Sequence, residues 1–157
     1  MKIDSGCFGI SDEERDDGVC RIANCLNLTQ LEIVHFCFVD FKRFELSNVN
    51  SLQSIQFGEY CIIRVREFVL DGLESLGSVR IGDGPFSSYG IRQRGQYDGV
   101  CRIVNCPSLI QLEFGKNRFT GFYRFELSNV NSLQSIIFGD CCFEYAENCI
   151  LKGKLSY

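Results

Sequence analysis

Apolar residues recur along this chain at fixed spacings within a unit of about 24 residues. Numbered from the first apolar residue of each unit, they occupy positions 0, 3, 6, 9 and 11, and a further large apolar residue stands at position 16. All of these slots are apolar in five full copies, whose position-0 residues are Ile22, Leu46, Leu70, Ile103 and Leu127. Such columns indicate a tandem array in which each unit packs on its neighbours.

The chain also contains an exact repeat of a longer stretch of sequence. The stretch from Arg43 to Ile55 recurs unchanged as Arg124 to Ile136, 81 residues later. It repeats polar residues as well as apolar ones, and core packing does not require that. The identity therefore favours a recent duplication of a three-unit block, while the apolar columns carry the structural information.

The end of each unit alternates between apolar and polar residues. In Leu52–Phe57, residues 55 and 57 are predicted to face inward and residues 54 and 56 outward, which is typical of a half-buried strand. Stacked copies predict a parallel sheet on one face, and a second alternation around Phe44–Leu46 and its equivalents predicts short extended segments on the opposite face. The segments that lead back from one predicted sheet strand to the next are rich in β-branched and aromatic residues and have no 3.6-residue period, so helices are not expected there.

This spacing resembles the leucine-rich repeat, whose core motif L-x-x-L-x-L-x-x-N begins here at Leu52-x-x-Ile55-x-Phe57. The resemblance covers nearly the whole chain. It implies a β-rich, right-handed solenoid, filled by the aromatic column at position 16 together with Phe44, Phe68 and Phe125, and a role in binding proteins or peptides. The segments Asn24–Leu28 and Asn105–Leu109 are similar to the C-x-x-L-x-x-I/L variety of bacterial and protist surface repeats.

The chain departs from that family at its asparagine column, which here holds Phe36, Tyr60, Gly84, Asn117 and Cys141. The tight turn must therefore be made in another way. Glycine accepts positive φ without a steric penalty. We accordingly predict that the turn is made by the glycines at position 12, which are Gly58, Gly82, Gly115 and Gly139.

The columns predict a single array over residues 1–157, with full units starting near 20, 44, 68, 101 and 125 and partial units at both ends. Two polar insertions, residues 9–18 and 87–99, are predicted as exposed loops. The first is acidic and the second carries Arg92 and Arg94, so they are either solvated loops or contacts for assembly. Because solenoids normally carry polar capping repeats, the partial units predict a fragment of a longer array, with self-association through open ends as a further expectation.

Composition and charge exclude some functions. The net charge of -4 argues against a general nucleic-acid binder, which needs a basic patch. No apolar run approaches the roughly 18 residues of a membrane span, and the N-terminus has no signal-peptide pattern. We therefore expect no membrane contact and favour a cytoplasmic location, with the cell surface as the alternative for a piece of a longer protein.

Ten cysteines leave two interpretations, a disulfide framework or reduced thiols in the core. Cys25 and Cys106 occupy a slot that Val49 and Val130 fill elsewhere, as small buried hydrophobic residues do. This favours free thiols, although a bridge between Cys37 and Cys61 on adjacent coils remains open. The repeated Cys-x4-Cys pairs lie three coils, or about 14 Å, apart, so they cannot share one zinc site, and we expect no metal and no cofactor.

In a solenoid with a filled core, chemistry is left to the outward columns. Position 10 combines charges with amides, and position 13 is mostly charged. The predicted function is therefore a non-enzymatic module that binds a protein or peptide through the strand face, with the ligand-binding residues Glu32, Gln56, Arg80 and Glu113 together with Glu59, Asp83 and Lys116. The structural alternative is that Arg80 and Glu113 form only a cross-strand pair of small energy.

Two other functions stay open. A surface or adhesin repeat could act as a spacer or bind glycans, and a glycan on the sequon at Asn27 would favour it. A solenoid enzyme acting on polysaccharide would use the acids of position 13, Glu59, Asp83 and Asp140. No catalytic motif is present and the single histidine, His35, has no predicted nucleophile beside it, so we expect no catalytic residue.

Overall fold

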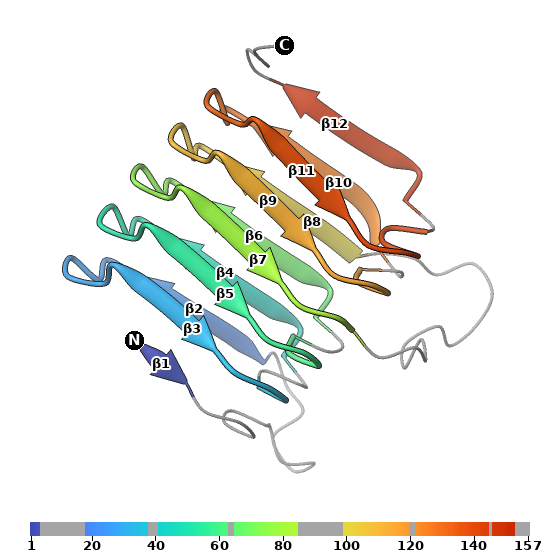
Figure 1. Ribbon diagram of the computed structural model, residues 1–157, viewed down its shortest axis with the longest axis horizontal. Helices are drawn as coiled ribbons and strands as arrows, with labels where there is room; N and C mark the ends of the chain where they lie inside the picture. Colours follow the sequence, from blue (N-terminus) through green and yellow to red (C-terminus); the bar gives the residue numbers. More distant parts are fainter. Residues whose placement is uncertain are drawn as a thin grey trace.

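The computed structural model describes residues 1–3, 18–37, 41–62, 65–84, 99–119, 122–144 and 146–152. These residues form two six-stranded parallel sheets, sheet A and sheet B, which lie face to face (Figure 1). The chain alternates between the sheets, so that one strand of each makes one coil of a parallel β-solenoid. The described residues contain strands and turns and no helix.

Sheet A holds the strands predicted from the end of each unit. In spatial order they are β1 (Lys2–Ile3), β3 (Gln30–Ile33), β5 (Ser54–Phe57), β7 (Ser78–Ile81), β9 (Gln111–Phe114) and β11 (Ser135–Phe138). Sheet B holds the predicted segments of the opposite face. Its strands are β2 (Val19–Ala23), β4 (Arg43–Ser47), β6 (Glu67–Asp71), β8 (Gly99–Val104), β10 (Phe122–Ser128) and β12 (Asn148–Lys152).

Equivalent positions pair from coil to coil. Phe57 of β5 lies opposite Ile81 of β7, and Ile81 lies opposite Phe114 of β9. In parallel strands a shift of one residue would turn every side chain to the other face. The pairing of equal slots therefore keeps the apolar columns of the inner coils in the core, as the sequence predicts.

The core between the sheets is built from stacked aromatic and aliphatic columns. Phe44 and Phe68 are fully buried and stack with ring centroids 5.5 Å apart, and Phe57 meets both rings edge to face. Phe119 and Phe125 are also buried, as predicted. Phe38 and Phe86 of the position-16 column lie outside the described residues. These rings give the core its volume and its preferred edge-to-face contacts.

The predicted role of the position-12 glycines is wrong. None of them has positive φ; the left-handed residues stand at positions 14 and 16 and are Phe36, Tyr60, Ile62, Asn117, Phe119, Cys141 and Phe143. The glycines serve another purpose, because neighbouring coils approach each other closely at position 12. A Cβ on Gly115 would lie 2.6 Å from the carbonyl carbon of Gly82, so any side chain would push the coils apart.

A second left-handed column, at position 2, was not predicted. It turns the chain from sheet B toward sheet A and consists of Asn24, Asn48, Gly72, Asn105 and Asn129. Asparagine and glycine are the residues that adopt this conformation most readily. The Asn129 amide donates to the Asn105 side-chain oxygen at 2.7 Å, and the Asn105 amide donates to Asp71 at 2.8 Å. The asparagine column of the leucine-rich repeat, which would stand at position 14, is thus not kept, but an asparagine-rich column stands at position 2.

The end coils differ from the inner ones. Cys25 is exposed although it was predicted in the core, because its coil has a neighbouring strand of sheet B on one side only; Cys106 in the same slot is fully buried between two coils. The predicted insertions, residues 9–18 and 87–99, lie outside the described residues except for Gly18 and Gly99. In the described part of the chain no helix is long and apolar enough to cross a membrane.

Candidate binding face

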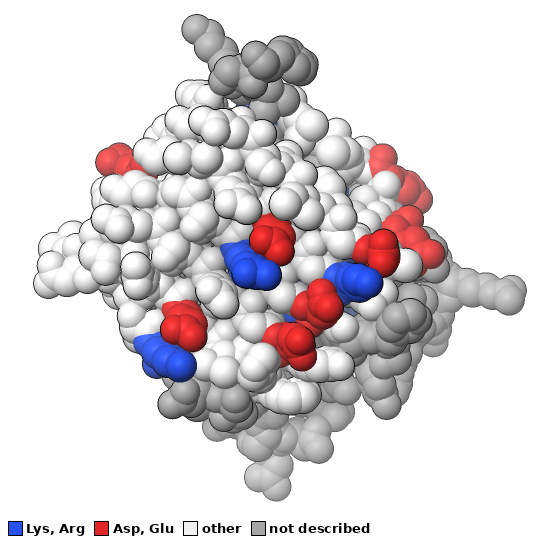
Figure 2. All heavy atoms as spheres, in the orientation of Figure 1, with Lys and Arg blue, Asp and Glu red and all other residues white. Residues whose placement is uncertain are grey.

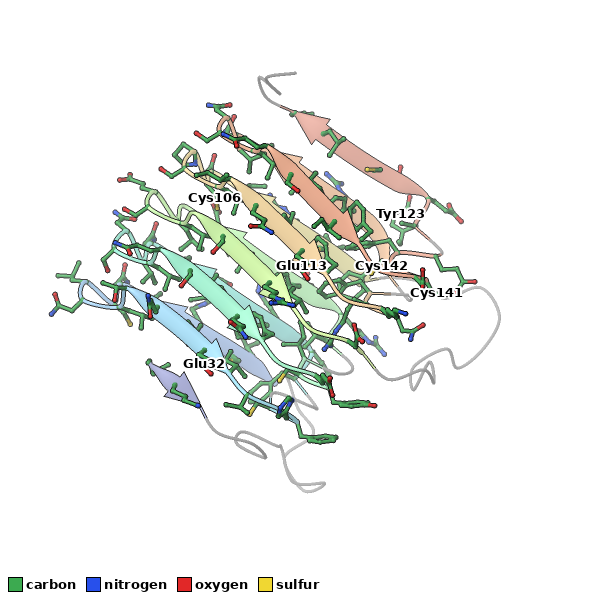
Figure 3. All side chains as sticks on the ribbon, in the orientation of Figure 1. Glu32, Cys106, Glu113, Tyr123, Cys141 and Cys142 are labelled. Atoms are coloured by element: carbon green, nitrogen blue, oxygen red, sulfur yellow. The ribbon has the colours of Figure 1, made fainter. Side chains whose placement is uncertain are left out.

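The outward side of sheet A, here called the sheet A face, gathers four of the predicted residues in one column. Strand pairing places Glu32 beside Gln56, Gln56 beside Arg80 and Arg80 beside Glu113. Lys2 and Ile137 extend the column at its two ends. Four residues that are far apart in the sequence thus form one continuous row across the sheet, and Figure 3 labels Glu32 and Glu113 on it.

Charges along this row are arranged as separate exposed pairs. Lys2 Nζ lies 3.5 Å from Glu32, and Arg80 Nε lies 3.4 Å from Glu113. Figure 2 views the molecule from the side of sheet A, and paired blue and red groups stand there on a mostly uncharged surface. Exposed pairs of this kind contribute about 0–1 kcal/mol to folding. Their charges are therefore available to a partner at little cost to the fold.

The other three predicted residues form a second row, in the turn that follows each strand of sheet A. The backbone N–H of Glu59 donates to His35 Nδ1 at 3.1 Å, and the N–H of Lys116 donates to Asp83 at 2.8 Å. Lys116 Nζ also lies 3.3 Å from Asp140. His35 and Asp83 therefore stabilise the stacking of turns, while Glu59 and Lys116 keep exposed side chains.

Small residues lie on both sides of the position-10 row. Ser54 and Ser78 stand at position 8, and Gly58, Gly82 and Gly115 fill position 12. Close approach of the backbones leaves little room for a side chain at these three glycines. The sheet A face and its turn row thus make a shallow, wettable surface.

The outward side of sheet B carries an ion network that sequence reasoning missed. Glu45 accepts hydrogen bonds from Arg43 at 3.0 Å and from Arg21 at 3.3 Å. Burial raises the pKa of Glu45, but the hydrogen bond and charge of Arg43 and the charge of Arg21 outweigh it, so that the pKa lies below its usual value. The duplicated copy repeats the cluster, with Arg124 at 2.8 Å and Arg102 at 3.5 Å from Glu126.

The signal for this network was the sequence Arg-Phe-Glu, which opens both copies of the duplicated stretch. Its carboxylates are largely covered by the arginines: Glu45 and Glu126 keep 13% and 12% of their side chains exposed, whereas Glu32 on sheet A keeps 51%. The carboxylates of Glu45 and Glu126 on sheet B are therefore less accessible than that of Glu32 on sheet A.

Arg118 is a second group that sequence reasoning missed. It interrupts the cysteine column of position 15, is only 3% exposed, and donates to the carbonyl oxygens of Cys61, Asp83, Gly58 and Gly82. Burial lowers the pKa of its guanidinium to about 10, against the opposing charges of Cys61 and Asp83, so that it stays protonated at neutral pH. It is a buried cation satisfied by backbone oxygens, and it fastens three coils together.

No disulfide joins the cysteines that the structure describes. Burial raises the pKa of Cys20 to about 11 and that of Cys106 to about 12. Because the thiolate is the reactive form, such thiols are poor nucleophiles at neutral pH. The thiols of Cys61 and Cys106 instead donate weak hydrogen bonds to backbone carbonyls.

The described residues contain no group of three or more side chains placed to hold a metal ion. His35 uses Nδ1 in its bond with the Glu59 backbone. Comparisons with protein-family models, curated protein sequences and solved structures find no match to this chain.

Proposed function

We propose that this chain is a non-enzymatic binding module that recognises a protein or peptide through the sheet A face and its turn row. The observation that supports this most directly is the in-register row of Glu32, Gln56, Arg80 and Glu113, which is varied in charge and exposed except for the half-buried Glu113. A partner with complementary charges can replace the weak pairs of this row with its own contacts.

Two features favour sheet A over sheet B. The carboxylates of sheet B are covered by arginines of the same face, so a partner would have to break an existing network to reach them. On sheet A, Glu32 keeps 51% and Glu113 keeps 29% of the side chain exposed, against 13% for Glu45 and 12% for Glu126 on sheet B. Sheet A therefore offers charge without a large cost of rearrangement.

The size of the face bears on affinity. Six strands about 4.8 Å apart make a row about 24 Å long. Five of these strands have four residues and β1 has two. The area of the strand face is therefore smaller than the roughly 800 Å² per partner of a standard protein interface. We expect a reversible interaction, in which the turn row adds to the contact area.

We also propose that the array is of leucine-rich-repeat type, with right-handed winding. The support is the L-x-x-L-x-L spacing at Leu52, Ile55 and Phe57. Each of these apolar positions forms a column of buried residues in the inner coils. The left-handed asparagines at position 2, rather than those expected at the end of the motif, would mark a distinct variety.

The test compares two variants that differ only in the face they change. Arg80→Glu and Arg102→Glu each reverse the arginine of a cross-strand ion pair, with N–O distances of 3.4 and 3.5 Å, on opposite faces. Each variant is first shown to be folded by its thermal unfolding curve. Partners are then captured from the source cell under reducing conditions and titrated against the wild type and both variants.

We expect Arg80→Glu to weaken binding of a selective partner at least tenfold and Arg102→Glu to leave it nearly unchanged. Equal losses in both variants would contradict a site on sheet A. If the folded wild type retains no selective partner, the proposal is wrong and a role as a spacer or presenting segment gains support.

A further inference from the structure

The last coil of the solenoid exposes residues that belong to core columns. Phe138 of β11 is 47% exposed and Leu151 of β12 is 49% exposed. Their equivalents on the adjacent strands of the same sheets, Phe114 of β9 and Leu127 of β10, are each 1% exposed. The last coil therefore keeps the apolar slots of an inner coil, whereas a terminal coil that ends a solenoid in water carries polar residues there.

The two ends of the stack have complementary steps. Among the described residues, sheet A extends one strand beyond sheet B at the first end, because β1 precedes the coil formed by β2 and β3. At the other end of the described stack, sheet B extends one strand beyond sheet A, because β12 follows the coil formed by β10 and β11. One overhang is thus a strand of sheet A and the other a strand of sheet B, which are the two components of a single coil (Figure 1).

We propose that a second copy of this chain docks head to tail on the last coil, so that β12 of one copy and β1 of the next complete one shared coil. In this arrangement β1 of the second copy pairs with β11, and β2 of the second copy pairs with β12. The contact is heterologous, since two different ends meet, and it can repeat to form longer stacks.

The residue columns fit this arrangement. Leu151 has the register position of Leu127, and Ile22 has that of Leu46. At the junction Leu151 would therefore continue the same apolar column into Ile22 of the second copy. Phe138 would likewise lie beside Ile3 of the second copy, because both residues hold the same register position in sheet A. Each of these two apolar core positions at the open end would therefore lie next to the equivalent apolar position of the second copy.

Backbone hydrogen bonding follows the same repeat. In each inner coil the position-12 glycine donates to the position-11 carbonyl of the coil before it, as Gly115 does to Ile81 at 2.6 Å and Gly139 to Phe114 at 2.7 Å. The next acceptor in this series is the carbonyl of Phe138, and β11 is the last strand of sheet A in the described part of the chain. An unpaired strand edge of this kind is a template for another chain. A second copy offers one strand edge to each of the two sheets.

The test uses one variant for each end and a matched control. Leu151→Lys places a charge at the end of the core column, while Ile110→Lys changes a residue of similar exposure, 46%, on an inner coil. Ile22→Lys places the charge at the first end. Mass is measured by sedimentation velocity over about a hundredfold range of concentration, since association follows mass action, and unfolding curves identify the variants that remain folded.

We expect the mass of the wild type and of Ile110→Lys to rise with concentration, while Leu151→Lys and Ile22→Lys each stay monomeric. Mixing these two variants restores one intact junction, so a 1:1 dimer that grows no further is expected. This mixture keeps the proposal testable, because two misfolded variants would not form a defined dimer. A monomeric wild type at all concentrations would overturn the proposal. Self-association of Ile22→Lys alone would also overturn it, because the contact would then join two like ends.

Discussion

The guanidinium of Arg118 donates a 2.5 Å hydrogen bond to the carbonyl oxygen of Cys61, which lies 57 residues earlier in the chain. Arg118 stands in a column whose other described members, Cys37, Cys61 and Cys142, are small. Its long side chain can therefore reach past the adjacent coil. The bond joins turns of different coils and thus adds a lateral fastening to the sheet ladders.

Arg118→Met is expected to lower the free energy of unfolding by about 3–5 kcal/mol, because buried carbonyls lose their charged donor. Methionine keeps much of the apolar stem, so the change reports chiefly on hydrogen bonding. Urea unfolding measures it. Arg102→Met is the control, and this exposed arginine should cost about 1 kcal/mol or less. Equal effects of the two substitutions would mean that Arg118 fastens nothing.

Gly115→Ala is expected to destabilise the fold by about 1–3 kcal/mol or more, because its Cβ would overlap the backbone of the adjacent coil. Gly77→Ala is the matched control, since a Cβ there would meet Gln53 at an ordinary 3.5 Å. Alanine at Gly77 should be neutral or slightly stabilising through the unfolded chain. Thermal unfolding of both variants tests the explanation; a tolerated Gly115→Ala would show that the coils can move apart freely.

Asn105 allows backbone strain to be separated from side-chain bonding. Asn105→Gly removes the bonds to Asp71 and Asn129 but fits the left-handed backbone, as Gly72 does in the same column. Asn105→Ala removes the same bonds and adds the cost of a left-handed alanine, about 1 kcal/mol or more. We expect alanine to be less stable than glycine by that amount in chemical denaturation. The reverse order would exclude backbone conformation as the reason for the asparagine column.

The buried thiols predict a loss of stability at high pH. Burial raises the pKa of Cys106 to about 12 in the folded state from an ordinary value of 9.0. Between these two pH values the unfolded chain has released the proton and the folded chain has not. The stability contributed by the neutral thiol is therefore complete below pH 9 and falls by about 1.4 kcal/mol per pH unit above it.

Cys106→Val should flatten this slope, because valine fills the same slot as Val49 and Val130. Val130→Cys is the converse variant and should steepen the slope by a similar amount. Unfolding free energies measured between pH 8 and about 11 would test both. If the two variants follow the wild-type curve in parallel, the buried thiols do not govern the alkaline transition.

The sequence by itself determined the repeat, its two sets of strands and nearly all of the core. This was possible because inward columns are constrained identically in every coil: Phe44 and Phe68 face the same neighbours, so the same residue type recurs at a fixed spacing. The rows of the candidate face could also be aligned, since coils stacked in register carry equal positions side by side.

Only the tertiary structure decided features that depend on contacts between unlike positions. The glycine column was read as a source of positive φ, but its cause is the approach of the neighbouring backbone, which no local pattern records. Cys25 lost the burial of its column because its coil stands at an end. Arg118 binds carbonyls of other coils, and the Arg43–Glu45 cluster depends on packing across sheet B. A periodic sequence specifies what every coil shares, whereas the end of a stack, or a side chain that reaches beyond its own slot, is specified only in three dimensions.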